Sequence, residues 1–224
     1  MTIDVTLDVM LKGVDLVANT ALLTLGGKMG YENKLLGMRR LESYGFSIDT
    51  SDPRSTLTVL RRVLNTQATF YNRNKHNYLL KCVWDGDSLV EGISPDEQDR
   101  QLVSQVKSSL TAGAGQDLDG AGEKIQVILK SKSVFKADVL VEDTDASAKE
   151  KISRKLEAEL STAPVVVHTL GTRWQLALAA DADEDARALA EEIVVTERRD
   201  RGLLLNPNYQ GHRFLGVEKI DLTG

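Results

Sequence analysis

The chain has 224 residues, of which 42% are hydrophobic and 27% are charged, and its net charge is −5. This composition is typical of a soluble globular protein and excludes an intrinsically disordered chain. It also disfavours a dedicated nucleic-acid-binding protein, because a largely acidic surface would repel the polymer. The length allows one large domain or two small ones.

A single cysteine, Cys82, excludes an intramolecular disulfide and suits a reducing compartment. The cysteine and the histidines stand at positions 76, 82, 168 and 212, which is not a zinc-ligand spacing, and no cofactor-binding motif is present. The first ten residues hold two aspartates and no lysine or arginine, unlike a signal peptide, and residues 14–27 are too short and too polar to span a membrane. We therefore expect a cytoplasmic protein without metal or cofactor.

The N-terminal part of the sequence predicts strands and helices in alternation. Residues 2–10 alternate between apolar and polar side chains, which predicts a half-buried strand. Helical patterns follow in residues 14–22 and 53–65, the second with its apolar residues on one stripe. Residues 33–44 also predict a helix, ended by a glycine at 45, and residues 78–84 predict a strand.

The middle of the sequence predicts a helix followed by a linker. Ser94, Pro95 and the acids after them form a strong helix start, and the helix should run to about residue 110. Residues 111–122 contain four glycines among small and polar neighbours, which predicts flexible coil. We therefore predict a basic N-terminal α/β unit over 1–110, a linker over 111–122 and a C-terminal unit over 123–224.

The sequence of the C-terminal unit predicts two helices among several strands. Residues 124–129 and 134–141 predict strands, and residues 144–160 a helix. Residues 164–168 and 174–179 predict a hairpin with its turn at Gly171 and Thr172. A helix over 183–198 and a strand over 212–220 complete the unit. From residue 134 the order is β-α-β-β-α-β, so the sequence predicts an α+β protein whose C-terminal unit is ferredoxin-like.

Two short segments also suggest an internal duplication. Each reads Asn-x-Asn, then His-x-aromatic-Leu, and each lies between a predicted last helix and a predicted last strand. The first copy is Asn72, Asn74, His76, Tyr78 and Leu79, and the second, with two extra residues, is Asn206, Asn208, His212, Phe214 and Leu215. Coincidence and a true repeat both explain so short a match.

Positive charge is segregated in the sequence, and segregated charge can select a partner. Residues 1–84 carry 11 lysines and arginines against 7 acids, whereas residues 85–224 carry 17 against 26. Residues 53–84 contain no acidic residue at all. The cations and histidine of this window are Arg54, Arg61, Arg62, Arg73, Lys75, His76 and Lys81, interleaved with Phe70, Tyr71, Tyr78 and Trp84.

The first functional hypothesis is a non-enzymatic binding or assembly protein that uses residues 54–81 to hold an anionic or a protein partner. Arginine and lysine would neutralise the partner's charge, and aromatic side chains would offer stacking surfaces. The same pattern also fits a solvated basic face with its aromatic residues in the core, or a face that contacts the acidic half of the chain. The candidate binding residues are Arg61, Arg62, Arg73, Lys75, His76 and Tyr78, with His212 and Arg213 near the C-terminus.

The second hypothesis is an enzyme that acts on a small anionic substrate in a cleft between the two units. His76 or His212 would act as acid or base, with Arg73 and Arg213 nearby. The sequence shows no paired carboxylates and no nucleophile–base or metal-ligand spacing, which favours the binding hypothesis. Catalytic residues are therefore not assigned.

Partners are expected to be proteins, because sheets of this class leave edge strands open. We expect a homo-oligomer or a complex with another protein, with nucleic acid less favoured and no membrane. Residues 35–46, and Leu203-Leu204-Leu205-Asn206-Pro207 before the final strand, resemble the small PurS subunit of purine biosynthesis over about ten residues in each half. In that family a ferredoxin-like chain ends its second helix in a Leu-Leu-x-Asn-Pro turn. The resemblance implies a non-catalytic assembly subunit.

Overall fold

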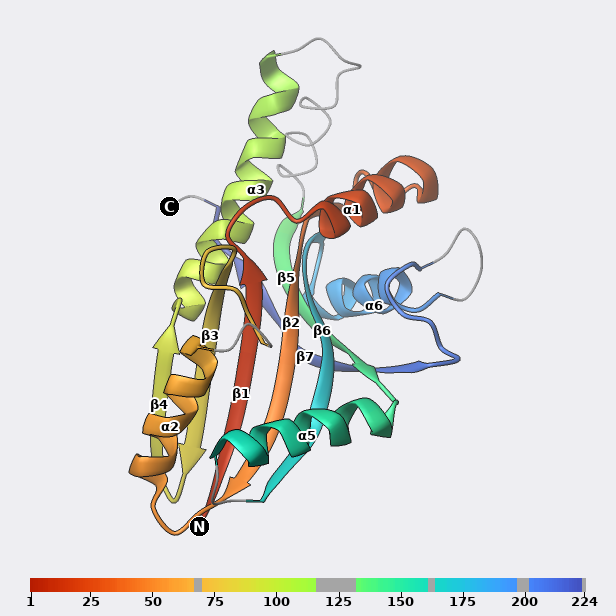
Figure 1. Cartoon of the computed structure of the whole chain (residues 1–224). Helices are drawn as coiled ribbons and strands as arrows, with labels where there is room; N and C mark the ends of the chain where they lie inside the picture. The colour runs from red at the N-terminus through yellow and green to blue at the C-terminus, as the bar shows by residue number, and fades with distance from the viewer. Residues whose placement is uncertain (67–69, 116–131, 161–163, 197–201, 223–224) are drawn as a thin grey trace. The chain divides into compact units, whose positions relative to one another are not determined.

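The computed structural model describes residues 1–66, 70–115, 132–160, 164–196 and 202–222, and they form an α+β fold (Figure 1). Seven strands are hydrogen-bonded in the order β4-β3-β1-β2-β6-β5-β7 as an antiparallel sheet. The strands are β1 (Thr2–Leu11), β2 (Leu35–Asp49), β3 (His76–Trp84), β4 (Asp87–Gly92), β5 (Ser133–Asp143), β6 (Val165–Ala180) and β7 (Gln210–Ile220). The described helices are α1 (Leu16–Met29), α2 (Pro53–Thr66), α3 (Pro95–Gly115), α5 (Ala146–Leu160) and α6 (Asp183–Val194). The predicted α+β class is confirmed.

The described chain forms two compact units, and each draws on separated stretches of sequence. Unit 1 comprises Met1–Val14, Leu41–Pro95 and Glu142–Thr172, and unit 2 comprises Asp15–Arg40, Asp96–Val141 and Arg173–Gly224. The division predicted at residues 111–122 concerns consecutive sequence regions and stays a prediction. The two compact units are divided differently, because each takes residues from both sides of 111–122. In unit 1, α2 and α5 cover a core that includes residues of β1, β2, β3 and β6 (Figure 1).

Strand β2 corrects the prediction of a helix over residues 33–44. Leu35 and Met38 lie in a core with α1, while Leu36 packs against Leu102 and Val106 of α3. A strand that is covered on both faces loses the alternation that marks a half-buried strand. Its leucines, methionine and arginines are also good helix formers. Residues 35–44 therefore form a strand despite their local preference for a helix, because burial on both faces outweighs that preference.

Strand β6 corrects the predicted hairpin. Val165–Ala180 is one continuous strand of 16 residues, and Gly171 and Thr172 lie within it. The described elements from residue 133 onward therefore run β-α-β-α-β, not β-α-β-β-α-β.

The linker prediction is wrong over its first five residues. Helix α3 (Pro95–Gly115) continues through residues 111–115, although two of these are glycines. Residues 116–122 and the strand predicted over 124–129 lie outside the described residues.

Buried Cys82 lies in the core of unit 1, as expected for a structural thiol. Burial raises its pKa to about 12, and the nearby charge of Glu91 adds to the shift. Because the thiolate is the reactive form, we expect no reaction of the native chain with Ellman's reagent at pH ~8. One thiol per chain should react after unfolding in guanidinium chloride. A fast reaction of the native protein would contradict this assignment.

Candidate functional site

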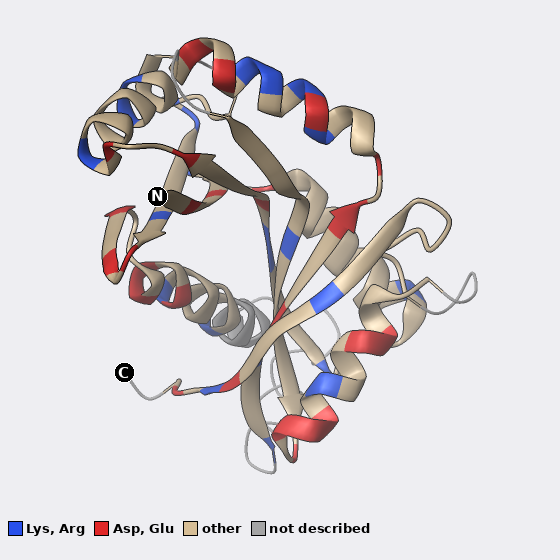
Figure 2. Ribbon diagram, turned by 90° about the horizontal axis from the view of Figure 1, so that it is seen from below, with Lys and Arg blue, Asp and Glu red and all other residues tan. Residues whose placement is uncertain are grey.

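Helix α2 separates an apolar face from a basic one. Leu57, Leu60, Val63 and Leu64 are buried, whereas the three arginines of the helix are exposed. Arg54, Arg61 and Arg62 are spaced at i, i+7 and i+8, so they share the outer side of the helix. We call these three residues the α2 basic face. All charged residues of α2 are cations, while α5 carries both signs (Figure 2).

The aromatic residues of the same window are part of the core rather than of this face. Phe70 and Tyr71 are 4% and 3% exposed. The Phe70 ring meets Tyr44 edge-on at 5.3 Å between centroids, and Tyr71 stacks on Tyr78 at 4.8 Å. Phe70 and Tyr71 therefore offer no free surface on which a base can stack.

Glu91 of β4 supplies the acid that residues 53–84 lack. Its carboxylate accepts hydrogen bonds from Arg61 Nε and, at 2.9 Å, from the Tyr78 hydroxyl. Burial, followed by the hydrogen bond to Glu91 and its charge, raises the pKa of Tyr78. The structure thus brings the predicted site residues Arg61 and Tyr78 together, but through an acid from outside the window.

Arg73, Lys75 and His76 share the turn that leads into β3. The Asn72 carbonyl accepts from the backbone N–H of Lys75 at 2.9 Å and of His76 at 2.8 Å. The N–H of Asn72 donates to His76 Nδ1 at 2.9 Å, and the N–H of Asn74 donates to the Asn72 side-chain oxygen at 2.9 Å. His76 therefore closes a turn, while the charged ends of Arg73 and Lys75 are exposed.

The turn before β7 makes the same set of hydrogen bonds. The Asn206 carbonyl accepts from the N–H groups of Tyr209 and Gln210. The N–H of Asn206 donates to Gln210 Oε1 at 3.1 Å, and the N–H of Asn208 donates to Asn206 Oδ1 at 3.1 Å. Gln210 thus has the same place in this turn as His76 has in the turn before β3, whereas the sequence comparison pairs His76 with His212.

The last two predicted site residues, His212 and Arg213, lie on β7 in unit 2, whereas the other six lie in unit 1. His212 Nε2 is 3.8 Å from Glu191 Oε1, and its ring meets Phe214 edge-on at 6.2 Å. Arg213 is exposed.

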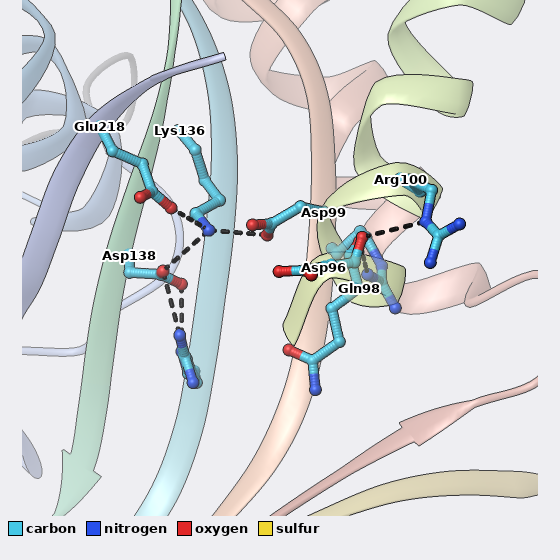
Figure 3. A network of polar contacts seen from close by, with 9 residues as sticks. Asp96, Gln98, Asp99, Arg100, Lys136, Asp138 and Glu218 are labelled. Carbon is cyan, nitrogen blue, oxygen red and sulfur yellow. Dashed lines mark hydrogen bonds and ion pairs between the residues drawn. The ribbon is translucent and has the colours of Figure 1, made fainter. Parts of the chain in front are cut away.

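Sequence reasoning missed a buried ion network in unit 2, drawn in Figure 3. Lys136 Nζ on β5 lies 2.6 Å from Asp99 Oδ1 of α3 and 3.9 Å from Asp138 Oδ2, and it also contacts Glu218 of β7. Arg173 of β6 binds Asp138 with two parallel hydrogen bonds of 3.0 Å. Lys136 and Asp138 are each 7% exposed. The partners are far apart in sequence, so only the charged residues within the apolar run of β5 hinted at the network.

Arg39 lies beside this network and is itself buried. Its guanidinium donates to the Gln98 carbonyl at 2.6 Å and to Gln101 Oε1 at 2.8 Å. Burial lowers the pKa of Arg39, opposed by the charges of Asp99 and Asp138. Every charge of the network faces an opposite charge or a carbonyl, so the arrangement holds elements of unit 2 together and leaves no free reactive group at Lys136.

A cavity of about 290 Å³ borders the network and has a mixed lining. It is lined by Asp96, Asp99, Arg100, Val103, Lys136, Glu218, Lys219, Ile220 and Asp221. The interleaved acids and bases do not select one sign of ligand. Within the described ranges, no group of histidine, cysteine or carboxylate side chains is arranged to hold a metal ion.

No helix within the described part of the chain is long and apolar enough to cross a membrane. Comparisons with protein-family models, with curated proteins and with solved structures find no significant match to this chain. Functional inference therefore depends on the surfaces described above.

Proposed function

We propose that the chain is a non-enzymatic binding or assembly protein that holds an acidic surface of a protein partner on the α2 basic face. The observation that carries the proposal is the outer side of α2, which exposes three arginines in a chain of net charge −5. Arg61 has Glu91 as partner, whereas neither Arg54 nor Arg62 forms an ion pair with any described residue. Cations without an internal ion pair are available to an anionic partner, because no existing pair has to be broken first.

The partner is a protein surface rather than single-stranded nucleic acid because the aromatic residues of the window are occupied. Binding of unpaired strands combines cations with exposed aromatic rings. Phe70 and Tyr71 are buried, and Tyr78 is held by Tyr71 and Glu91. Trp84 is partly buried against the core, and the outer side of α2 exposes arginines and small polar residues, which suits the carboxylates of a protein.

The scaffold in this proposal is a duplicated β-α-β-α-β unit. Strands β1, β2 and β3 lie in the order β2-β1-β3, and strands β5, β6 and β7 in the order β6-β5-β7. The Asn-x-Asn turns before β3 and β7 make matching hydrogen bonds. A duplicated scaffold and the short resemblance to PurS both favour a role in assembly.

The proposal is tested by fluorescence anisotropy with a labelled deca-glutamate peptide at low salt and at about 150 mM salt. We expect salt-sensitive binding that Arg54→Ala/Arg62→Ala weakens about tenfold, since each surface ion pair contributes up to about 1 kcal/mol. Arg61 is retained because its contact with Glu91 supports the fold.

The matched control is Lys28→Ala/Lys34→Ala, which removes the same charge from two exposed positions of unit 2. Equal weakening by both variants would show that only net charge matters and would refute a site on α2. A labelled oligothymidine that binds more tightly than the peptide would instead make the face a nucleic-acid site.

A further inference from the structure

Helix α1 exposes apolar side chains that a surface helix normally buries. Leu16 and Leu23 are 74% and 75% exposed, and Val17 is 51% exposed. The helix holds no charged residue before Lys28 near its end. A helix with apolar residues on its outer as well as its inner side indicates a contact surface.

An apolar groove runs beside this helix. It has a volume of about 520 Å³ and is lined by Leu16, Val17, Thr20, Ala21, Thr24, Trp174, Leu203 and Leu204. All of these residues belong to unit 2. The volume of the groove is large enough for an apolar side chain of a second molecule.

The polar atoms of the groove are already satisfied within α1. Thr20 Oγ1 donates to the Leu16 carbonyl at 2.7 Å, and Thr24 Oγ1 donates to the Thr20 carbonyl at 2.8 Å. These hydroxyls keep their hydrogen bonds when the face is covered, so covering it leaves no unpaired polar group.

Helix α5 follows strand β5 as α1 follows β1, but the outer face of α5 is charged. Its exposed positions include Lys151, Arg154 and Lys155, and Arg154 pairs with Glu150. The apolar outer face of α1 is therefore a property of this one helix.

The exposed pattern of α1 is complementary to itself. Leu16 and Leu23 are seven residues apart and point in nearly the same direction, with Asn19 and Thr20 midway between them. When two such helices cross antiparallel about a two-fold axis, Leu16 of each copy meets Leu23 of the other. Asn19 then lies near the axis, where a polar residue fixes the register. Residues 16–27 carry no charge, so no like charges of the two helices meet within this contact.

We propose that the α1 face is the interface of a homodimer, with α1 packed antiparallel against α1 of a second copy of this chain. The lone charge of α1, Lys28, lies at the end of the helix and outside this contact. The proposal goes beyond the α2 basic face, which belongs to unit 1.

Sedimentation velocity of the full chain tests the dimer. We expect twice the chain mass of 24.6 kDa for the natural chain and the single mass for Leu16→Glu/Leu23→Glu. Leu16→Glu/Leu23→Lys should dimerise more strongly than Leu16→Glu/Leu23→Glu, because each Glu would then meet a Lys rather than a Glu of the other copy. Val90→Glu/Val166→Glu, which changes two exposed valines of unit 1, should leave the dimer intact. A natural chain that is monomeric at about 100 μM would overturn the proposal, since the dissociation constant of a stable homodimer lies well below that concentration.

A cysteine cross-link tests the register independently. Thr20→Cys should give a disulfide-linked dimer under oxidising conditions, because residue 20 lies close to the proposed axis and Cys82 is buried. Thr58→Cys is the matched control, since Thr58 is also exposed on a helix and donates its hydroxyl four residues back. Cross-linking of Thr58→Cys as fast as of Thr20→Cys would refute the α1 interface. In Arg54→Ala/Arg62→Ala the dimer should persist, so failure of one proposal is distinguishable from failure of the other.

Discussion

Replacing Asp138 by asparagine is expected to lower the free energy of unfolding by about 3 kcal/mol, the range for removing one partner of a buried ion pair. Asp138 is 7% exposed and forms ion pairs with both Lys136 and Arg173. The substitution keeps the shape of the side chain but leaves the two cations short of one negative charge in a poorly solvated site. Urea unfolding followed by circular dichroism measures the change.

The control for Asp138→Asn is Glu218→Gln, which removes a carboxylate from the same network at a position that is largely open to solvent. The Glu218 side chain is 61% exposed, so water replaces most of what the carboxylate contributes. The expected loss for Glu218→Gln is under about 1 kcal/mol, as for surface ion pairs. Equal losses for the two variants would mean that burial does not strengthen the network.

The same network sets a dependence of stability on pH. Burial alone lowers the pKa of Lys136, but hydrogen bonds to Asp99 and Glu218 and the charge of Asp138 outweigh burial and raise it above 10.5. A raised pKa stabilises the folded state below the pKa of the unfolded chain, and this stabilisation is lost as pH rises through the folded pKa. The difference between the natural chain and Asp138→Asn should therefore hold steady across neutral pH and shrink above about pH 10.5.

Substitution of Gly92 by alanine is the second change for which we expect a large loss of stability. Gly92 has φ of +98°, and a Cβ atom there would lie 2.0 Å from the Tyr78 carbonyl oxygen. That oxygen accepts the Ile93 N–H at 2.8 Å, so it cannot withdraw without losing a hydrogen bond. The neighbouring Glu91 would move as well and weaken its contact with Arg61. We expect a loss of about 3 kcal/mol or more, from the positive φ and the clash together.

Gly86→Ala separates the two causes. Gly86 also has positive φ, +87°, but a Cβ atom at this position meets nothing within 4 Å. Its substitution should cost only the conformational penalty of about 1 kcal/mol. The urea midpoints of the two variants give the comparison, and a Gly92→Ala variant no less stable than Gly86→Ala would show that the Tyr78 carbonyl yields freely.

Elements with one solvated face were predictable from the sequence. Strand β1 alternates between exposed and buried residues from Thr2 to Leu7, and helix α2 buries its apolar residues on one stripe, and the sequence predicts both elements. Strand β2 gave no such alternation because both of its faces are covered over residues 35–41. A local pattern cannot show which neighbours will cover an element, so the sequence predicts a helix over residues 33–44 where the structure has strand β2.

The candidate sites were predictable only in part, for the same reason. The arginines of α2 were found because they are close in sequence. The acid that pairs with Arg61 comes from β4, outside the acid-free window. The Lys136 network joins residues from α3, β5, β6 and β7, and no spacing along the chain relates them. The sequence shows that α1 carries no charge before Lys28, but it does not show that the apolar side chains of this helix are exposed.

The interleaving of the two units has a consequence for synthesis on the ribosome. The core of unit 1 includes Leu156, Leu160, Val165 and Val167 together with residues of β1, which are made first. The earliest strand must therefore wait until about three quarters of the protein has been translated before its apolar side chains are fully covered. The charges of Asp4 and Asp8, interleaved with the apolar residues of β1, should oppose aggregation of that nascent segment.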